Sequence, residues 1–175
     1  LNVANSVPPL IGQTFSVSSV NDLCILEFDF EAGGDSISFN YVFGSDEYLT
    51  YVNTPYNDIF AFFLSGPGIS GTYASPALFP DGAINIAEVP ESDPQLPVTI
   101  SSVNNVTNPE YYVNNPGNLG ICINGYTQTF TASASVQCGE TYHIKLAIAD
   151  GSDSILESFV VLEEGSFSSN AIDIV

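Results

Sequence analysis

Short runs of alternating apolar and polar residues dominate this chain. In 36–43 and 141–149 every second residue is apolar, a period of two that predicts strands with one buried face. The run 59–64 is apolar at every position, which predicts a strand in the middle of a sheet. No segment shows the period, cap and stop of a helix. Together the pattern predicts strands at 26–30, 36–43, 59–64, 83–87, 97–103, 126–132, 141–149 and 156–163.

Many short strands, a few long loops and no helices predict an all-β fold. The segments between the runs are rich in Gly, Pro, Asn and Asp, which are typical of turns. We therefore expect a two-layer antiparallel β-sandwich of jelly-roll type with long loops. The length of 175 residues fits a single domain, 1–175, and we expect it to be cut from a longer protein.

The charge of the chain is unusual because bases are nearly absent. The formal net charge is −19, with Lys145 as the only Lys, no Arg and a single His. Without a basic surface, nucleic acid and anionic membranes are excluded as partners. The charge instead favours cations and a saline or extracellular setting. No signal peptide or transmembrane run is present in the sequence.

Two acidic turns are the main candidates for chemistry. One lies at 46–47 after an apolar run and continues to 57–58 at the start of the apolar strand, and the other lies at 150–153. A carboxylate at the end of a buried strand needs a neutralising partner, and bases are scarce. Hard oxygen ligands in turns suit Ca²⁺, so we expect a calcium site if the two turns meet. The candidate ligands are Asp46, Glu47, Asn57, Asp58, Asp150 and Asp153, with Glu157 in reserve. The alternative is that these acids are ordinary turn residues.

Several tyrosines lie beside the acidic segments. Tyr rings with Asn and Asp nearby present flat apolar area with a polar tip, a surface suited to sugars or peptides. The candidate ligand-binding residues are Tyr48, Tyr56, Tyr111, Tyr112 and Asn114. The alternative is that these rings cap the ends of the sandwich.

Three cysteines occur, with no C-x-x-C pair, which argues against a thiolate zinc site. Cys122 and Cys138 flank a segment that reads as a hairpin, so a disulfide between them is one interpretation, with Cys24 as a free buried thiol. The other is that all three are buried free thiols.

Catalysis has little support in the residues. His143 is the single histidine and lies within a predicted strand, where a hydrogen-bonded sheet residue is the simpler interpretation. Asp46 and Glu47 are adjacent and so point to opposite faces of an extended segment, unlike a glycosidase pair. An isopeptide crosslink through Lys145 is a further alternative, although Lys145 lies opposite the apolar face of its strand. We therefore expect that this domain is not an enzyme.

Several blocks of sequence resemble one known family. They are 26–30, 41–48, 56–69, 97–104, 111–114, 138–150 and 165–169. In order and spacing these blocks resemble the choice-of-anchor L domain of large bacterial surface proteins. The resemblance implies a secreted or cell-surface protein of adhesin type.

Residues and resemblance together lead to three hypotheses. The first is a monomeric, calcium-stabilised extracellular adhesion module that binds carbohydrate or peptide. The second is a structural spacer that binds nothing itself. The third is an enzyme acting on polysaccharide.

Overall fold

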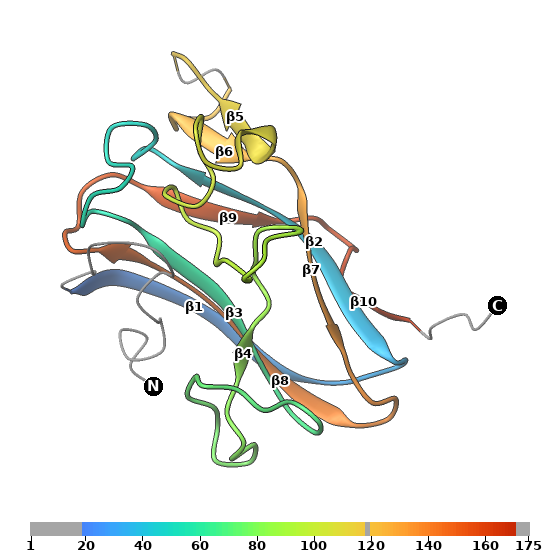
Figure 1. Ribbon diagram of the computed structural model, residues 1–175. Helices are drawn as coiled ribbons and strands as arrows, with labels where there is room; N and C mark the ends of the chain where they lie inside the picture. The colour runs from blue at the N-terminus through green and yellow to red at the C-terminus, as the bar shows by residue number, and fades with distance from the viewer. Residues whose placement is uncertain (1–18, 118–119, 171–175) are drawn as a thin grey trace.

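Two antiparallel sheets packed face to face make up the fold (Figure 1). The computed structural model describes residues 19–117 and 120–170. Their strands are β1 (Val20–Glu31), β2 (Ser36–Ser45), β3 (Ile59–Ser65), β4 (Ile84–Asn85), β5 (Tyr112–Asn114), β6 (Gly125–Thr127), β7 (Phe130–Ser135), β8 (Thr141–Gly151), β9 (Ser158–Leu162) and β10 (Ser168–Asn170). The predicted all-β sandwich is confirmed. No helix in the described ranges is long and apolar enough to cross a membrane.

Each sheet is organised around one or two long strands. The first sheet has the order β1-β8-β3-β4. In the second, β2 is the long central strand, with β6 and β7 following one another along one edge and β9 and β10 along the other. The short strand β5 extends this sheet beyond β6. Because β3 pairs antiparallel with β8 and β9 pairs antiparallel with β2, the connections β2–β3 and β8–β9 lie at the same end of the sandwich (Figure 1).

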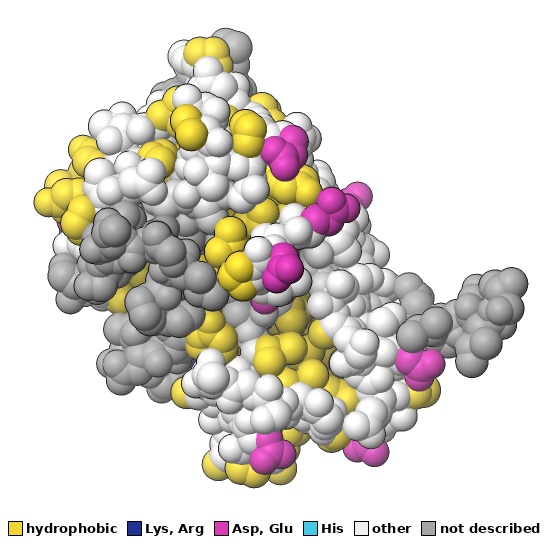
Figure 2. All heavy atoms as spheres, in the orientation of Figure 1, with side chains coloured by type: hydrophobic (Ala, Val, Ile, Leu, Met, Phe, Trp, Pro, Cys, Tyr) yellow, Lys and Arg dark blue, Asp and Glu magenta, His cyan; other side chains and the backbone are white. Residues whose placement is uncertain are grey.

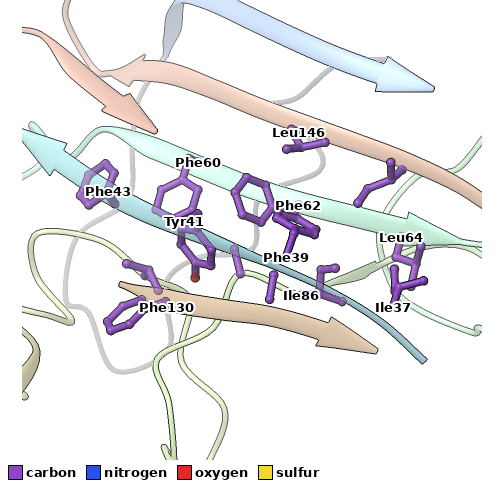
Figure 3. Packing of buried hydrophobic residues seen from close by; sticks show 14 of the residues in the cluster. Ile37, Phe39, Tyr41, Phe43, Phe60, Phe62, Leu64, Ile86, Phe130 and Leu146 are labelled. Carbon is purple, nitrogen blue, oxygen red and sulfur yellow. The ribbon is translucent and has the colours of Figure 1, made fainter. Parts of the chain in front are cut away.

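The core lies between β2 and β3, as the alternation of apolar residues predicted. Figure 3 shows the aromatic rings of the two strands facing each other. The rings of Tyr41 and Phe62 meet edge to face at 4.8 Å, and those of Phe43 and Phe60 stack at 4.8 Å. Such aromatic pairs add to the stabilisation from apolar burial.

The strand β3 is buried along its whole length, as its unbroken apolar run predicted. Its inner face contributes to the core between the sheets. On its outer face, Ala61 and Phe63 are covered by Tyr73 and Ala83 from the segment that follows the strand. This covering segment explains why β3 carries no polar alternation.

The chain's two basic side chains lie together on the outer face of the first sheet. The Nζ of Lys145 is 3.0 Å from a carboxylate oxygen of Glu27, and the Nδ1 of His143 is 2.8 Å from one of Asp29. The prediction that His143 is a hydrogen-bonded sheet residue is confirmed. Because both basic groups already face β1, neither serves as a counterion for the acidic turns.

Two predicted strands differ in the structure. The segment 126–132 is divided into β6 and β7, because one extra residue lies between the pairs Gly44–Tyr126 and Tyr41–Phe130. Such a bulge switches the buried face, so Thr127 and Phe130 are both buried.

The segment 97–103 is a buried turn and not a strand. Its apolar side chains are inside, with Val98, Ile100 and Val103 fully buried. The Thr99 hydroxyl accepts hydrogen bonds from the N–H groups of Ser101 and Ser102, both at 3.1 Å. Such local side-chain bonds compete with strand pairing and close the chain into a turn.

The predicted disulfide between Cys122 and Cys138 is wrong, as all three cysteines are free. The segments on either side do not pair as a hairpin. They run in sequence along one edge of β2, where β6 pairs at Ser45 and β7 at Ser36, so the strand ends next to the two cysteines lie roughly 30 Å apart. A disulfide needs Cα atoms within about 7 Å. Cys24 is exposed and not buried as expected.

Candidate functional site

The two acidic turns meet at one end of the sandwich, at the left of Figure 1. The carboxylate of Asp58, at the entrance to β3, accepts a hydrogen bond from the N–H of Gly151, at the end of β8, at 3.2 Å. The hydroxyl of Ser152 donates to the carbonyl of Pro55 at 2.7 Å. These bonds join segments more than ninety residues apart, so the meeting of the turns is a property of the sheet topology.

Two of the acids at this end are fully buried. Glu47 is 1% exposed and Asp58 is 0% exposed. The carboxylate of Glu47 accepts a hydrogen bond from the N–H of Asp58 at 3.0 Å, while the Oδ2 atom of Asp58 has no hydrogen-bond partner. The Ser158 hydroxyl lies near this carboxylate and lowers its pKa. A carboxylate buried this deeply is costly unless a proton, a donor or a cation offsets its charge.

Burial also acts on the protonation of Glu47. Burial, together with the charges of the neighbouring acids Asp58, Asp153 and Asp150, raises the pKa of Glu47 to about 8, against the lowering effect of the Asp58 N–H. The folded protein therefore favours the protonated side chain near neutral pH. A bound cation would reverse this preference by stabilising the carboxylate.

The same physical causes act on the other acids. Burial raises the pKa of Asp58, with further contributions from Asp153 and Glu157, while Ser158 and the Gly151 N–H lower it. Burial, together with the charge of Asp58, raises the pKa of Asp150 to about 6. These carboxyl groups are therefore close enough for their charges to raise one another's pKa, and no basic side chain lies among them.

The other predicted calcium ligands make separate contacts near these acids. Asn57 is fully buried, its amide oxygen accepts from the Ser101 hydroxyl at 3.5 Å, and its amide nitrogen has no partner. Asp153 is partly buried and its carboxylate accepts from the N–H of Ile155 at 3.4 Å. Asp46 contacts Glu157 and Asn124 through its backbone, so no contact of its carboxylate joins it to the others.

We name the acidic cluster as Glu47, Asp58, Asp150 and Asp153. Within the described ranges, no group of three or more Asp, Glu, His and Cys side chains is arranged to hold a metal ion as it stands. Coordination of Ca²⁺ by the cluster would therefore need some of the partly buried side chains to turn, with backbone carbonyls or water completing six to eight oxygens.

Nothing in the sequence pattern indicated that β1 contributes to this end of the sandwich. Asn21 pairs with Asp150 in the sheet, and its side-chain amide donates to the carbonyl of Asp153 at 2.6 Å. The charge of Asp22 adds to the raised pKa of Asp150. Neither residue belongs to an acidic motif with recognisable spacing, so only the pairing of β1 with β8 brings them to the cluster.

A comparison with protein families decides what kind of domain this is. The sequence model of the Choice-of-anchor L domain family matches residues 7–168, nearly the whole chain. The chain belongs to this family. Comparisons with curated proteins and with solved structures gave no match. Choice-of-anchor domains belong to bacterial surface-anchored proteins.

In this Choice-of-anchor L domain, two of the candidate tyrosines serve packing. Tyr48 is 2% exposed, and its ring lies 4.9 Å from that of Tyr112 and 6.3 Å from that of Phe43. Burial removes the Tyr48 ring from the surface, which favours the alternative that this ring caps the end of the sandwich. Tyr111 is partly buried and packs edge to face on Phe130 at 5.3 Å.

The remaining candidates keep accessible surface near the acidic cluster. Tyr56 is 41% exposed and packs against Tyr51 at 5.7 Å. The hydroxyl of Tyr112 donates to the side-chain oxygen of Asn114 at 3.2 Å, and Asn114 is exposed. Because the Tyr112 ring touches Tyr48, which follows Glu47, this polar pair lies close to the acidic end of the domain.

Proposed function

We propose that the domain is a calcium-stabilised, non-catalytic module exposed on a bacterial cell surface, where it binds carbohydrate or peptide. Family membership supports the surface location. The observation that carries the calcium proposal is the complete burial of two carboxyl groups, Glu47 and Asp58, within an acidic cluster that has no base. Ca²⁺ would act by neutralising this cluster and by tying the connection 46–58 to the turn after β8.

Calcium fits the ligands better than the alternatives. Carboxylate and carbonyl oxygens in turns match the flexible coordination of Ca²⁺, whereas Mg²⁺ keeps its waters and demands strict octahedral geometry. Zinc prefers sulfur and imidazole, and the only imidazole is held by Asp29 on another face. The net charge of −19 raises the local concentration of cations of every kind, so the test has to separate specific from general effects.

The binding surface would lie beside the acidic cluster. Tyr56 offers an exposed ring, and Asn114 with the Tyr112 hydroxyl offers polar contacts at the edge of β5. An aromatic ring with nearby amides is typical of contact surfaces for sugars and peptides. We expect the module to act as a monomer.

A thermal melt tests the calcium proposal. The midpoint would be measured in excess EDTA, then with millimolar CaCl₂ and with millimolar MgCl₂ at constant ionic strength. A ligand present at a hundredfold excess over its dissociation constant stabilises the native state by roughly 3 kcal/mol, so we expect a shift of several degrees specific to calcium. Equal shifts with both ions would mean general screening and would reject the site.

A non-binding spacer is the second candidate function. It is favoured by the burial of Tyr48 and the packing of Tyr111 on Phe130, which leave fewer rings at the surface than the sequence predicts. Glycan and peptide arrays in the presence of calcium separate the two. Binding that is lost in Tyr56→Ala supports the adhesion module, and silent arrays support the spacer.

A further inference from the structure

A pocket lined by none of the acidic-cluster residues carries a further inference. It has a volume of about 320 Å³ and lies between the segment 71–73, the strand β4 and the segment 88–97. The residues that line it include Tyr73, Asn85, Glu88 and Gln95. This size falls within the range of small-molecule sites, and the combination of one ring, one carboxylate and two amides gives it a defined chemistry.

The walls of the pocket are held in place by bonds within the fold. Tyr73 exchanges backbone hydrogen bonds with Ala83 at 3.2 and 2.9 Å, and its ring lies 5.0 Å from that of Phe63. The side-chain oxygen of Asn85 accepts from the N–H groups of Phe62 and Ala87 at 2.9 and 3.0 Å. The pocket is therefore formed in advance of any ligand, which lowers the cost of binding.

One wall depends on a glycine. A Cβ on Gly71 would collide with the backbone of Ala83, so only glycine lets the two segments approach here. The N–H of Gly71 donates to the carbonyl of Asp81 at 3.1 Å, which holds this approach. The close packing of the two segments sets the rim of the pocket beside Tyr73.

Glu88 is the charged group of this pocket. Burial raises the pKa of its carboxyl group, and its charge in turn raises the pKa of Tyr73. Within 19–117 and 120–170, no hydrogen bond or ion pair to the carboxylate is found. The single Lys and the single His of the chain are held by Glu27 and Asp29 on β1, so neither neutralises Glu88.

We propose that this pocket binds an organic ammonium group, with the Glu88 carboxylate as its counterion and the Tyr73 ring beside it. A partly buried carboxylate without a counterion attracts a cation, and an aromatic ring adds a cation–π contribution. The mainly apolar remainder of the pocket suits the alkyl stem that carries the charge, so a lysine side chain of a peptide or a free alkyl amine shares the required chemistry. The face drawn in Figure 2 shows acidic side chains and no Lys, Arg or His, a surface that attracts such cations.

Calorimetric titration of the whole domain tests the proposal. The probes are N-acetyl-lysine methylamide, its uncharged isostere N-acetyl-norleucine methylamide, and 1,5-diaminopentane. EDTA is present throughout at physiological ionic strength, so the result is independent of the calcium site. We expect the lysine derivative or the diamine to bind and the norleucine derivative to bind at least about tenfold more weakly. The tighter of the two amines identifies the source, peptide or free amine.

A matched pair of variants separates the pocket from the overall charge. Glu88→Gln keeps the shape of the side chain and removes one charge, and Glu91→Gln removes one charge from an exposed position nearby that does not line the pocket. We expect amine affinity to fall about tenfold or more in Glu88→Gln and to stay unchanged in Glu91→Gln. Equal losses in both variants, equal binding of norleucine, or no amine binding would overturn the proposal.

Discussion

The buried carboxylate of Glu47 accepts a hydrogen bond from the backbone N–H of Asp58 at 3.0 Å, and the two acids share a site without a base. The arrangement is stable only if protons or a cation neutralise part of the charge. Glu47 and Asp58 lie at the two ends of the connection between β2 and β3. The state of this pair therefore bears on the order of the whole connection.

Glu47→Gln is expected to separate the two roles of this side chain, which accepts a hydrogen bond from the Asp58 N–H and carries a buried charge. Glutamine retains an oxygen that can accept from the Asp58 N–H but carries no charge to desolvate. We expect the melting midpoint of the calcium-free variant at pH 8 to rise above that of the native domain, and the shift produced by calcium to fall to less than half. The measurement is a thermal melt with and without calcium.

Glu31→Gln is the matched control for this change. Glu31 is exposed at the far end of β1, so the variant loses the same charge away from the cluster. Its calcium response should equal that of the native domain. A full calcium shift in Glu47→Gln would contradict a role for this carboxylate.

The stability of the calcium-free domain should fall as the pH rises from about 5 to 9. Burial raises the pKa of Asp150 to about 6 and that of Glu47 to about 8, so the folded state holds protons that the unfolded chain has already released. The stabilisation is complete below the ordinary carboxyl pKa and is lost as the pH passes through these raised values. Melting midpoints in EDTA across this range test the prediction.

Calcium and substitution should both alter this pH profile. Glu47→Gln removes the group that titrates near pH 8, so the upper part of the profile should flatten. Saturating calcium favours the ionised carboxylates and should also weaken the fall. A midpoint that rises steadily from pH 5 to 9 in EDTA would show that these acids are not buried as described.

The sequence was most informative where one pattern decides burial. The alternation in 36–43 identified β2, because its apolar side chains face the core and the others do not. The apolar run 59–64 identified β3, because both faces of this strand are buried. It failed at 97–103, where the Thr99 hydroxyl closes a turn within an equally apolar segment. Local hydrogen bonds of this kind leave the hydrophobic pattern unchanged, so the pattern could not reveal them.

The candidate site was predictable in part for the same reason. The acids of both turns could be recognised by their type and by the scarcity of bases, and the pairing of β3 with β8 brings the turns together. Which oxygen atoms remain without partners depends on distances across the sheet. The burial of Tyr48 likewise follows from its contact with Tyr112, a residue from a distant segment.

Three maleimide adducts are expected on the native protein. Cys24, Cys122 and Cys138 are all free and exposed, so each thiol should react without denaturant. Intact-mass spectrometry after brief labelling counts the adducts, and labelling in guanidinium gives the total for comparison. A single adduct in both conditions would restore the Cys122–Cys138 disulfide.

Glu27→Gln should destabilise the domain through Lys145. The Lys145 side chain is 8% exposed, and its Nζ lies 3.0 Å from the Glu27 carboxylate, which is 48% exposed. The variant leaves a buried ammonium group without its carboxylate. Since Glu27 is partly screened by solvent, we expect a loss of about 1–2 kcal/mol in the free energy of unfolding by urea.

Glu31→Gln again provides the comparison, since it removes one charge from the same strand without facing a base. Its free energy of unfolding should stay close to the native value or rise slightly, because the net charge of −19 falls in magnitude. Equal effects of the two variants would show that Glu27 contributes only to overall charge.

The contact with Glu27 also leaves Lys145 as a free amine. The intact mass of the native protein should therefore equal the mass calculated from the sequence. An isopeptide crosslink would instead lower it by the mass of the ammonia or water released.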